Sequence, residues 1–309
     1  MIHSVSLNEH IIRTLLYYKI FDHPLSANEL FYLLPMNSLD REQFRNYLAD
    51  MVNQGALLCS HKYYLLPKIS PEIFILRTQR ENYARRKMKI ARLMTHVIKR
   101  FPFVRGVFLS GDLSKGVARQ DSDIDYVIVT APHRLWICRA LLVIFKKVFL
   151  LNSKKYFCLN YFVATDQLKL EDQNYYTATE IAHLKPLYNI EIFLRYMNAN
   201  SWVKRFFPNY KVFALNHNKP NSRRSILQKI LEVFFFGRFA NHLDFWLMNT
   251  MKRIWAKRYP EYDEHTRDKI FRCTPTESCA YVGNFSDKIL SLYKEQLQQH
   301  GLHFQNIAQ

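Results

Sequence analysis

The segment FVRGVFLSGDLSKGVARQDSDIDYVIVT, residues 103–130, contains the pattern that decides the fold. Residues 104–109 are apolar and β-branched enough to form a buried strand, and residues 126–129 are a second run of this kind. Between them lie a turn with Gly111 and a polar segment that ends at Gln120. The order predicts two buried strands joined by a polar connection.

Two aspartates stand where the second apolar run begins. In a strand, residues two apart face the same side, so Asp123 and Asp125 should point together while Ile124 turns into the core. Two carboxylates at the start of a buried strand repel each other and lose hydration. A divalent cation with oxygen ligands would relieve both costs. The pattern therefore predicts a site for Mg²⁺ or Mn²⁺ at Asp123 and Asp125.

This combination resembles the polymerase-β-like nucleotidyltransferase superfamily, and within it the bacterial nucleotidyltransferase-like proteins. The family carries a Gly-Ser turn after one strand and an Asp-x-Asp sequence at the start of the next. Here Gly111-Asp112 takes the place of the Gly-Ser turn, and ten residues precede the Asp-Ile-Asp of residues 123–125. The resemblance covers residues 103–190 and implies an α/β (α+β) core with a small mixed sheet.

The resemblance also implies an activity and a set of site residues. The reaction would transfer a nucleoside monophosphate from a nucleoside triphosphate to a hydroxyl group, by two-metal chemistry with release of pyrophosphate. Asp123 and Asp125 would be catalytic and would hold the metal, with Asn160 as a third oxygen ligand. The phosphates would lie against the turn, because its backbone N–H groups and the missing Cβ of a glycine favour them. The residues of this phosphate site would be Ser110, Gly111, Asp112, Ser114 and Lys115. The acceptor, a nucleic acid, a protein or a small molecule, is not specified by these motifs.

Two residues depart from the family's pattern. Asp112 stands where Ser is usual, and its carboxylate repels phosphate unless a cation lies between them. Asn160, in an expected strand over residues 156–163, stands where active members carry a third carboxylate. The alternative hypothesis is therefore a protein that keeps the fold with little or no turnover and acts as a nucleic-acid-binding or regulatory module.

Residues 1–70 predict a small module in front of this core. We expect helices over residues 7–20, 26–34 and 39–53 and a β-hairpin over residues 56–66. The second helix has Ser26 and Glu29 at capping-box spacing. Three helices and a hairpin are typical of a winged helix, which either binds nucleic acid or packs on the neighbouring domain.

The remaining segments are expected to be mainly helical. Residues 71–102 predict a connecting basic helix with a docking stripe at Ile90, Leu93, Met94 and Val97, and residues 191–309 predict a helical C-terminal region. Within the core we expect helices over residues 132–151 and 177–187, the latter with Thr177 or Thr179 as its N-cap. Residues 203–258 hold twelve Lys or Arg and two acids, and the run 231–236 is expected in the core.

The whole chain is strongly basic. Its 309 residues are 49% hydrophobic and carry a formal charge of +18. The charge favours an anionic partner such as a nucleoside triphosphate or a nucleic acid, with a merely solvated basic surface as the alternative. Five cysteines without a C-x-x-C pair predict reduced thiols and a cytoplasmic location. Because no export signal and no membrane-spanning run are recognised, we expect no membrane partner.

Overall fold

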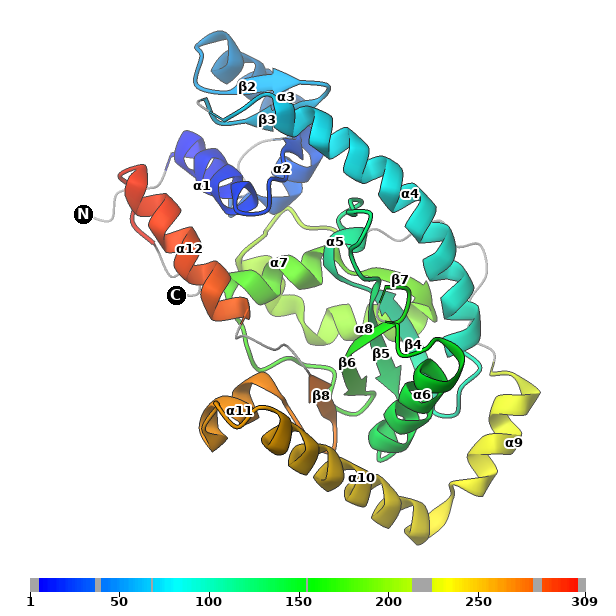
Figure 1. The fold of residues 1–309 in the computed structure, drawn as a ribbon. Coiled ribbons are helices and arrows are strands. Elements are labelled where there is room, and N and C mark those ends of the chain that lie inside the picture. The colour runs from blue at the N-terminus through cyan, green and yellow to red at the C-terminus, as the bar shows by residue number, and fades with distance from the viewer. Residues whose placement is uncertain are drawn as a thin grey trace.

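The chain folds into a mixed α/β structure, seen in a computed structural model (Figure 1). The structure describes residues 6–36, 40–67, 69–153, 155–212, 224–279 and 285–304, without the side chain of residue 227. Within these residues there are two sheets, one with strand order β1-β3-β2 and one with order β7-β4-β5-β6-β8. The expected mixed α/β class is confirmed.

The N-terminal part contains the expected helices and hairpin. Its elements are α1 (Leu7–Lys19), β1 (Leu25–Ser26), α2 (Ala27–Leu33), α3 (Arg41–Asn53), β2 (Leu58–Ser60) and β3 (Tyr63–Leu65). The capping box of Ser26 and Glu29 is present. The third helix begins at Arg41, later than expected, because Asp40 caps it, and residue 39 lies outside the described residues. The short strand β1 was not expected.

A single long helix, α4 (Glu72–Ile98), leads from this part to the larger sheet. Figure 1 shows it running along one side of the molecule. Its buried face contains Ala84, Lys87 and Ala91, while Leu93 of the expected docking stripe is 61% exposed. Ile90 and Met94 of the same stripe pack against the core beside the fully buried Ala91 and Ile98, so the expectation is right for these two residues and wrong for Leu93.

The larger sheet is built from the expected strands and two others. Its strands are β4 (Val104–Leu109), β5 (Asp125–Thr130), β6 (Cys158–Ala164), β7 (Lys185–Tyr188) and β8 (Glu277–Cys279). The central pair β4 and β5 is antiparallel, and β5 runs parallel to β6 across helix α6 (Leu135–Phe149). The edge strands β7 and β8 pair antiparallel with β4 and β6. The sheet is thus mixed.

Three local predictions inside the core are wrong. Helix α7 (Tyr175–His183) is capped by Asn174, whose side chain accepts from the backbone of Thr177, whereas Thr179 is buried inside the helix. The chain after α7 forms β7, because Pro186 cannot continue a helix. Helix α6 begins at Leu135 instead of residue 132, since the preceding turn holds a residue with positive φ.

The C-terminal region is mainly helical, as expected, apart from β8. It contains α8 (Ile190–Ala199), a short 3₁₀ helix (Ser201–Arg205), α9 (Ile226–Phe234), α10 (Gly237–Arg258), α11 (Glu264–Ile270) and α12 (Phe285–Gln299). Helix α12 returns to α1 and α7, as Figure 1 shows. There the ring of Tyr293 lies 5.2 Å from that of Tyr17 and 5.4 Å from that of Tyr175, measured between centroids.

Two apolar clusters cover the two faces of the larger sheet. In β5, Val127 and Val129 face α7, α8 and the N-terminal part, whereas Tyr126 and Ile128 face α4, α6 and α10. This alternation is the two-residue period of a strand. It places Asp125 on the same side as Val127, toward the N-terminal part of the chain.

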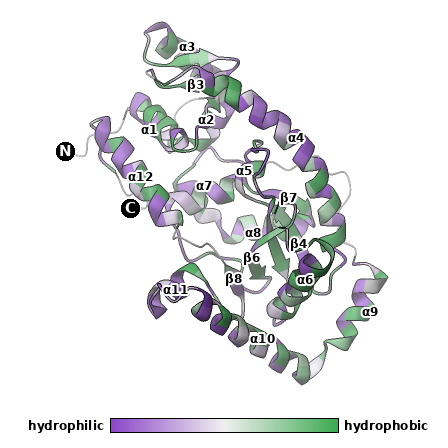
Figure 2. Cartoon of the chain, viewed as in Figure 1, coloured by the Kyte–Doolittle hydropathy of each residue, from purple (hydrophilic) through white to green (hydrophobic). Residues whose placement is uncertain are grey.

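The strands of the larger sheet are strongly hydrophobic, and α4 alternates polar and apolar residues (Figure 2). None of the helices in the described ranges is long and apolar enough to cross a membrane. All five cysteines are free thiols, as expected.

Candidate functional site

A cavity of about 660 Å³ lies where β4 ends and β5 begins. Seven of the eight predicted site residues line it: Ser110, Gly111, Asp112, Lys115, Asp123, Asp125 and Asn160. Seven residues that the sequence motif predicts for one site therefore do lie around one cavity. Ser114 is the exception, because it is buried and its hydroxyl donates to the carbonyl of Gly111 at 2.7 Å.

Asp125 is a half-buried carboxylate in the wall of this cavity. It is the first residue of β5, and the pairing of β5 with β6 places Cys158 beside it. Its Oδ1 accepts a hydrogen bond from the side-chain amide of Asn160 at 3.1 Å. Its backbone carbonyl accepts from the amide of Ser110 at 3.0 Å, which ties the turn after β4 to the start of β5.

Gly111 packs directly on the carboxylate of Asp125. The residue has a φ of +65°, in the left-handed region that glycine tolerates best. A Cβ placed on Gly111 would lie 2.5 Å from Oδ2 of Asp125, which is too close for any side chain. The four-residue helix α5 (Gly111–Ser114) starts from this turn. Any other residue here would therefore strain the backbone, and its Cβ would force the carboxylate of Asp125 to shift.

The surroundings of Asp125 favour its protonated form. Burial raises its pKa to about 6, and the negative charges of Asp123, Asp112 and Glu180 add to the effect, while a hydrogen bond from Cys158 opposes it. Repulsion among several carboxylates around one cavity is the arrangement expected of a cation site. Among the described residues, however, no group of three or more His, Cys, Asp and Glu side chains is placed to hold a metal ion together.

The predicted cation of the phosphate site is already paired. Lys115 donates from Nζ to Oε1 of Glu180 on α7 at 2.7 Å, so part of its charge is neutralised at the cavity wall. Arg119 also lines the cavity and is exposed. Arg80 on α4 lines it too, and donates to the backbone carbonyls of Phe21 at 2.9 Å and Asp22 at 3.1 Å. The turn after α1 thereby becomes part of the cavity wall.

Lys87 holds the loop in front of the aspartate pair. It is 6% exposed, and its ammonium group donates to the carbonyl and the hydroxyl of Ser122. The hydroxyl of Ser122 in turn accepts from the amide of Arg119 at 3.2 Å and donates to its carbonyl at 3.0 Å. The negative charges of Asp121 and Asp123 face the same ammonium group. Lys87 thus fixes the loop from the buried face of α4.

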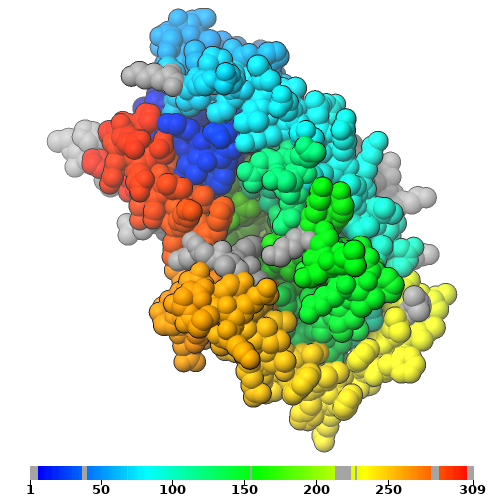
Figure 3. All heavy atoms as spheres, in the orientation of Figure 1, coloured from blue at the N-terminus to red at the C-terminus, as the bar shows by residue number. Residues whose placement is uncertain are grey.

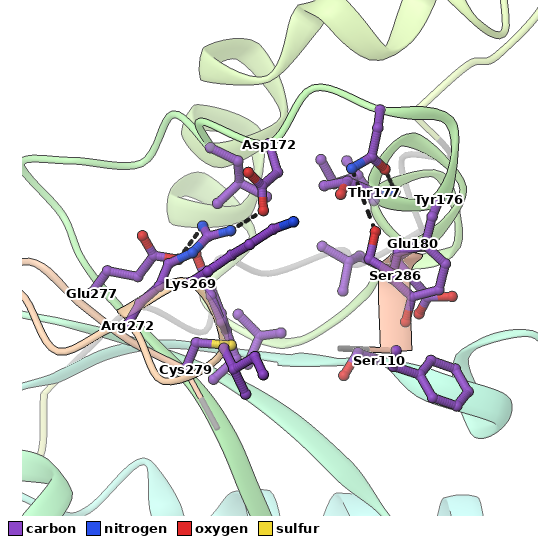
Figure 4. Close-up of a pocket in the computed structure, with 18 of the residues that line it drawn as sticks. Ser110, Asp172, Tyr176, Thr177, Glu180, Lys269, Arg272, Glu277, Cys279 and Ser286 are labelled. Carbon is purple, nitrogen blue, oxygen red and sulfur yellow. Dashed lines mark hydrogen bonds and ion pairs between the residues drawn. The ribbon is translucent and has the colours of Figure 1, made fainter. Parts of the chain in front are cut away.

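A second cavity, of about 240 Å³, adjoins the first. Four residues line both cavities: Ser110, Tyr176, Glu180 and Phe285. Figure 4 shows Arg272 between Asp172 and Glu277 on one side of this space, and Tyr176, Glu180 and Ser286 on the other. The deeper wall is apolar and includes Val127, Ile181 and Tyr196. The second cavity therefore combines polar edges with an apolar wall.

Sequence reasoning missed the wall residues that come from other segments. Lys87, Glu180 and Arg80 belong to helices remote from the aspartate pair in sequence, and only the fold brings them near. One indication that Lys87 is buried was available in the sequence: it lies three residues after Ala84 and four before Ala91, on the same face of a helix as these two small apolar residues.

Comparison of the chain with protein-family models, with curated proteins and with solved structures finds no match.

Proposed function

We propose that the protein is a Mg²⁺-dependent nucleotidyltransferase that transfers a nucleoside monophosphate from a nucleoside triphosphate to a hydroxyl group. The observation that supports this most strongly is the convergence of Asp123, Asp125 and the Gly111 turn on one cavity. The close packing of Gly111 on Asp125 joins the two halves of the sequence motif in a single contact. The family resemblance of residues 103–190 points the same way.

The donor atoms of the cavity suit a hard divalent cation. Mg²⁺ is commonly held by one or two carboxylates together with substrate phosphates and water. Asp123 and Asp125 supply two such carboxylates, and a nucleotide would supply the phosphate oxygens. When bound, Mg²⁺ neutralises charge on the phosphates and lowers the pKa of an attacking hydroxyl. Asn160 faces Asp125 through its amide nitrogen and therefore orients this carboxylate rather than adding a charge.

The chain's own groups would orient the triphosphate around this pair. The turn at Gly111 lets a phosphate approach the backbone, because no Cβ stands in the way. Arg119, exposed at the cavity, supplies a positive charge. Asp112 faces the same cavity, so its carboxylate must be screened by a cation when phosphate is present. We place the hydroxyl-bearing acceptor in the adjoining cavity, whose Ser110 also borders the aspartate pair.

The flanking regions fit the same proposal. Strand order β7-β4-β5-β6 around helix α6 agrees with a nucleotidyltransferase core. The element order α1-β1-α2-α3-β2-β3, with sheet order β1-β3-β2, agrees with a winged helix. Free thiols fit a cytoplasmic location.

A second candidate function is a binding or regulatory protein with this fold and little turnover. Two contacts favour it. Asn160, which donates to Asp125, stands in place of a third carboxylate. Glu180 forms an ion pair with the ammonium group of Lys115, which would otherwise be free to bind phosphate.

Thermal unfolding with each nucleoside triphosphate, with and without Mn²⁺, tests the proposal. A ligand that binds only the folded protein stabilises it by RT ln(1 + [L]/Kd), about 2.7 kcal/mol at a hundredfold excess over Kd. We expect a metal-dependent rise in Tm for one nucleotide, which Asp123→Asn removes and Asp166→Asn, an exposed residue outside the cavity, retains. A rise without metal, or one that survives in Asp123→Asn, would exclude the metal site. Release of pyrophosphate after a hydroxyl-bearing acceptor is added to this mixture, with the nucleoside monophosphate transferred to that acceptor, would identify an enzyme.

Metal binding should depend on pH through Asp125. Its pKa of about 6 means that a proton occupies the carboxylate below that pH and competes with the cation. We therefore expect Mn²⁺ affinity to fall about tenfold for each pH unit below 6 and to level off above it. Titration calorimetry from about pH 5 to about pH 8, on both sides of this pKa, measures the Mn²⁺ affinity at each pH. In Asp123→Asn the midpoint should move down, because one of the repelling charges is gone.

Loss of Lys87 should weaken the site without touching a ligand. Lys87→Met removes the donor to Ser122, so we expect a ten- to hundredfold loss of Mn²⁺ affinity, roughly as seen when outer partners of metal sites are removed. Lys89→Met is the matched control, because Lys89 lies exposed on the same helix. Equal affinities in the two variants would show that Lys87 does not position the loop.

A further inference from the structure

Helix α9 is attached to the protein by its polar residues. Gln228 is fully buried and donates from Nε2 to the carbonyls of Phe101 at 3.0 Å and Val104 at 2.9 Å. One turn later, Glu232 accepts from the amide of Phe103 at 2.7 Å and pairs with Arg105. Surface helices usually dock by their apolar side. In α9 the described helical side chains that hydrogen-bond to the protein are Gln228 and Glu232, and Phe235 at the C-cap adds a ring contact with Phe103 at 6.3 Å between centroids.

The apolar side of α9 faces outward. Ile226, Ile230, Val233 and Phe234 follow each other at helical spacing and are all exposed. The turn into α10 continues this surface, since Phe234, Phe236 and Phe239 are 75%, 84% and 73% exposed. These last three residues were part of, or next to, a run expected in the core. We call the six residues just named the α9–α10 corner, and Figure 2 shows hydrophobic colour on α9 and at its junction with α10.

Positive charge lies beside the α9–α10 corner. The exposed bases nearest to it in sequence are Lys229, Arg238 and Arg224, of which Arg224 pairs with Glu232. At the other end of α10, away from the corner, Arg253, Lys257 and Arg258 are exposed too, and Lys252 pairs with Asp268. Of the two acids between residues 224 and 258, Glu232 pairs with Arg105 and Arg224, and Asp244 is buried, so neither acid balances Lys229 or Arg238. Phe245 and Trp246 of α10 are exposed among these bases.

We propose that the α9–α10 corner binds the surface of an anionic phospholipid bilayer. Exposed aliphatic and aromatic side chains would enter the boundary between headgroups and acyl chains, and the bases would meet the lipid phosphates. A helix that lies in this boundary needs no membrane-spanning segment. Absence of an export signal and of a membrane-spanning run, on which we expected no membrane partner, does not bear on binding at the membrane surface.

Shape and charge favour this partner over two others. Figure 3 shows the junction of α9 and α10 as a projecting corner of the molecule, which suits insertion into a fluid layer. Two copies of the corner would bring like charges together, which opposes a dimer. Single-stranded nucleic acid would stack on Phe and Trp, but Ile226, Ile230 and Val233 offer no ring for a base.

Flotation of the full-length chain with vesicles tests the proposal. We expect binding to phosphatidylcholine vesicles that contain about a third phosphatidylglycerol, and at least tenfold weaker binding to pure phosphatidylcholine. The variant with Phe234→Ser, Phe236→Ser and Phe239→Ser should lose at least tenfold in binding to the anionic vesicles. Because these side chains are exposed, the variant should keep its far-ultraviolet circular dichroism and its thermal unfolding transition.

A matched control replaces exposed apolar residues at the other end of the molecule, Ile75→Ser and Leu58→Ser. This control should bind anionic vesicles as the wild type does. The proposal is overturned if the wild type ignores anionic vesicles, or if the triple variant binds them equally well. It is also overturned if the triple variant loses only self-association in light scattering, or only binding to a single-stranded RNA oligonucleotide.

Discussion

Asp125→Asn is expected to lower metal-dependent nucleotide binding and turnover by a hundredfold or more, and at the same time to make the protein more stable at neutral pH. The functional loss follows from the proposed role of the carboxylate, since even indirect partners of metal sites contribute roughly ten- to hundredfold. The gain in stability follows from the cavity. Burial and neighbouring carboxylates raise the pKa of Asp125 to about 6, so an ionised Asp125 is unfavourable in the folded state.

The sign of the stability change can be worked out from proton linkage. Between the unfolded pKa, roughly 4, and the folded pKa, about 6, the folded protein holds the Asp125 proton more often than the unfolded chain does. Stability therefore falls as pH rises through this window, and the loss is complete above it. Asparagine carries no charge and avoids this loss, so we expect Asp125→Asn to gain about 1–3 kcal/mol at pH 7.

Urea unfolding of both proteins without metal, at pH 4 and pH 7.5 (roughly either side of the window), measures the effect. The stability difference between wild type and variant should be small at the lower pH and large at the higher one. Asp166→Asn, at an exposed site outside the cavity, should show no such pH-dependent gain. A variant less stable than wild type at neutral pH would contradict the described surroundings of Asp125.

Gly111→Ala is expected to destabilise the protein by about 2–4 kcal/mol and to remove metal-dependent nucleotide binding. About 1 kcal/mol comes from the positive φ, and overpacking of a filled space adds about 1–3 kcal/mol. The space is filled by Asp125 itself, whose Oδ2 would lie 2.5 Å from the new methyl group. The carboxylate must move, and with it the oxygen proposed to hold the cation.

Gly116→Ala separates these two contributions. Gly116 also has a positive φ, of +78°, but a Cβ there would meet no atom within 4 Å. This variant should lose about 1 kcal/mol and keep nucleotide binding. Urea unfolding and the Mn²⁺-dependent Tm rise compare the two variants directly. Equal losses in both would mean that Gly111 is needed for its backbone conformation alone and does not pack on Asp125.

The core of the fold was predictable because its information is local. The apolar run 104–109, the Gly111 turn and the Asp125 strand start lie within thirty residues, and their order determines which strands are neighbours. The cap at Ser26 was readable for the same reason, since both partners of a capping box lie four positions apart or closer.

The errors arose where a residue's role depends on a distant segment. Strand β7 pairs with β4 across about eighty positions, and its short sequence resembles the end of a helix more than a strand. Phe234 and Phe236 were expected inside, because apolarity alone cannot tell a core from an outward face. The pairing of Lys115 with Glu180 was equally hidden, because no spacing rule joins the turn after α5 to helix α7.

Helix α1 cannot make all of its native contacts until α12, near the other end of the chain, has been synthesised. Tyr17 of α1 packs on Tyr293 of α12, and Arg13 exchanges hydrogen bonds with the same end of the chain, donating to the carbonyl of His303 and accepting from Tyr293. A ribosome adds about 5–20 residues per second, so α1 emerges tens of seconds before its partner does. During that interval Tyr17 gains its contact with Tyr175 of α7, 4.9 Å away between ring centroids, but still lacks the ring of Tyr293. The N-terminal part of this protein is therefore made first and completed last.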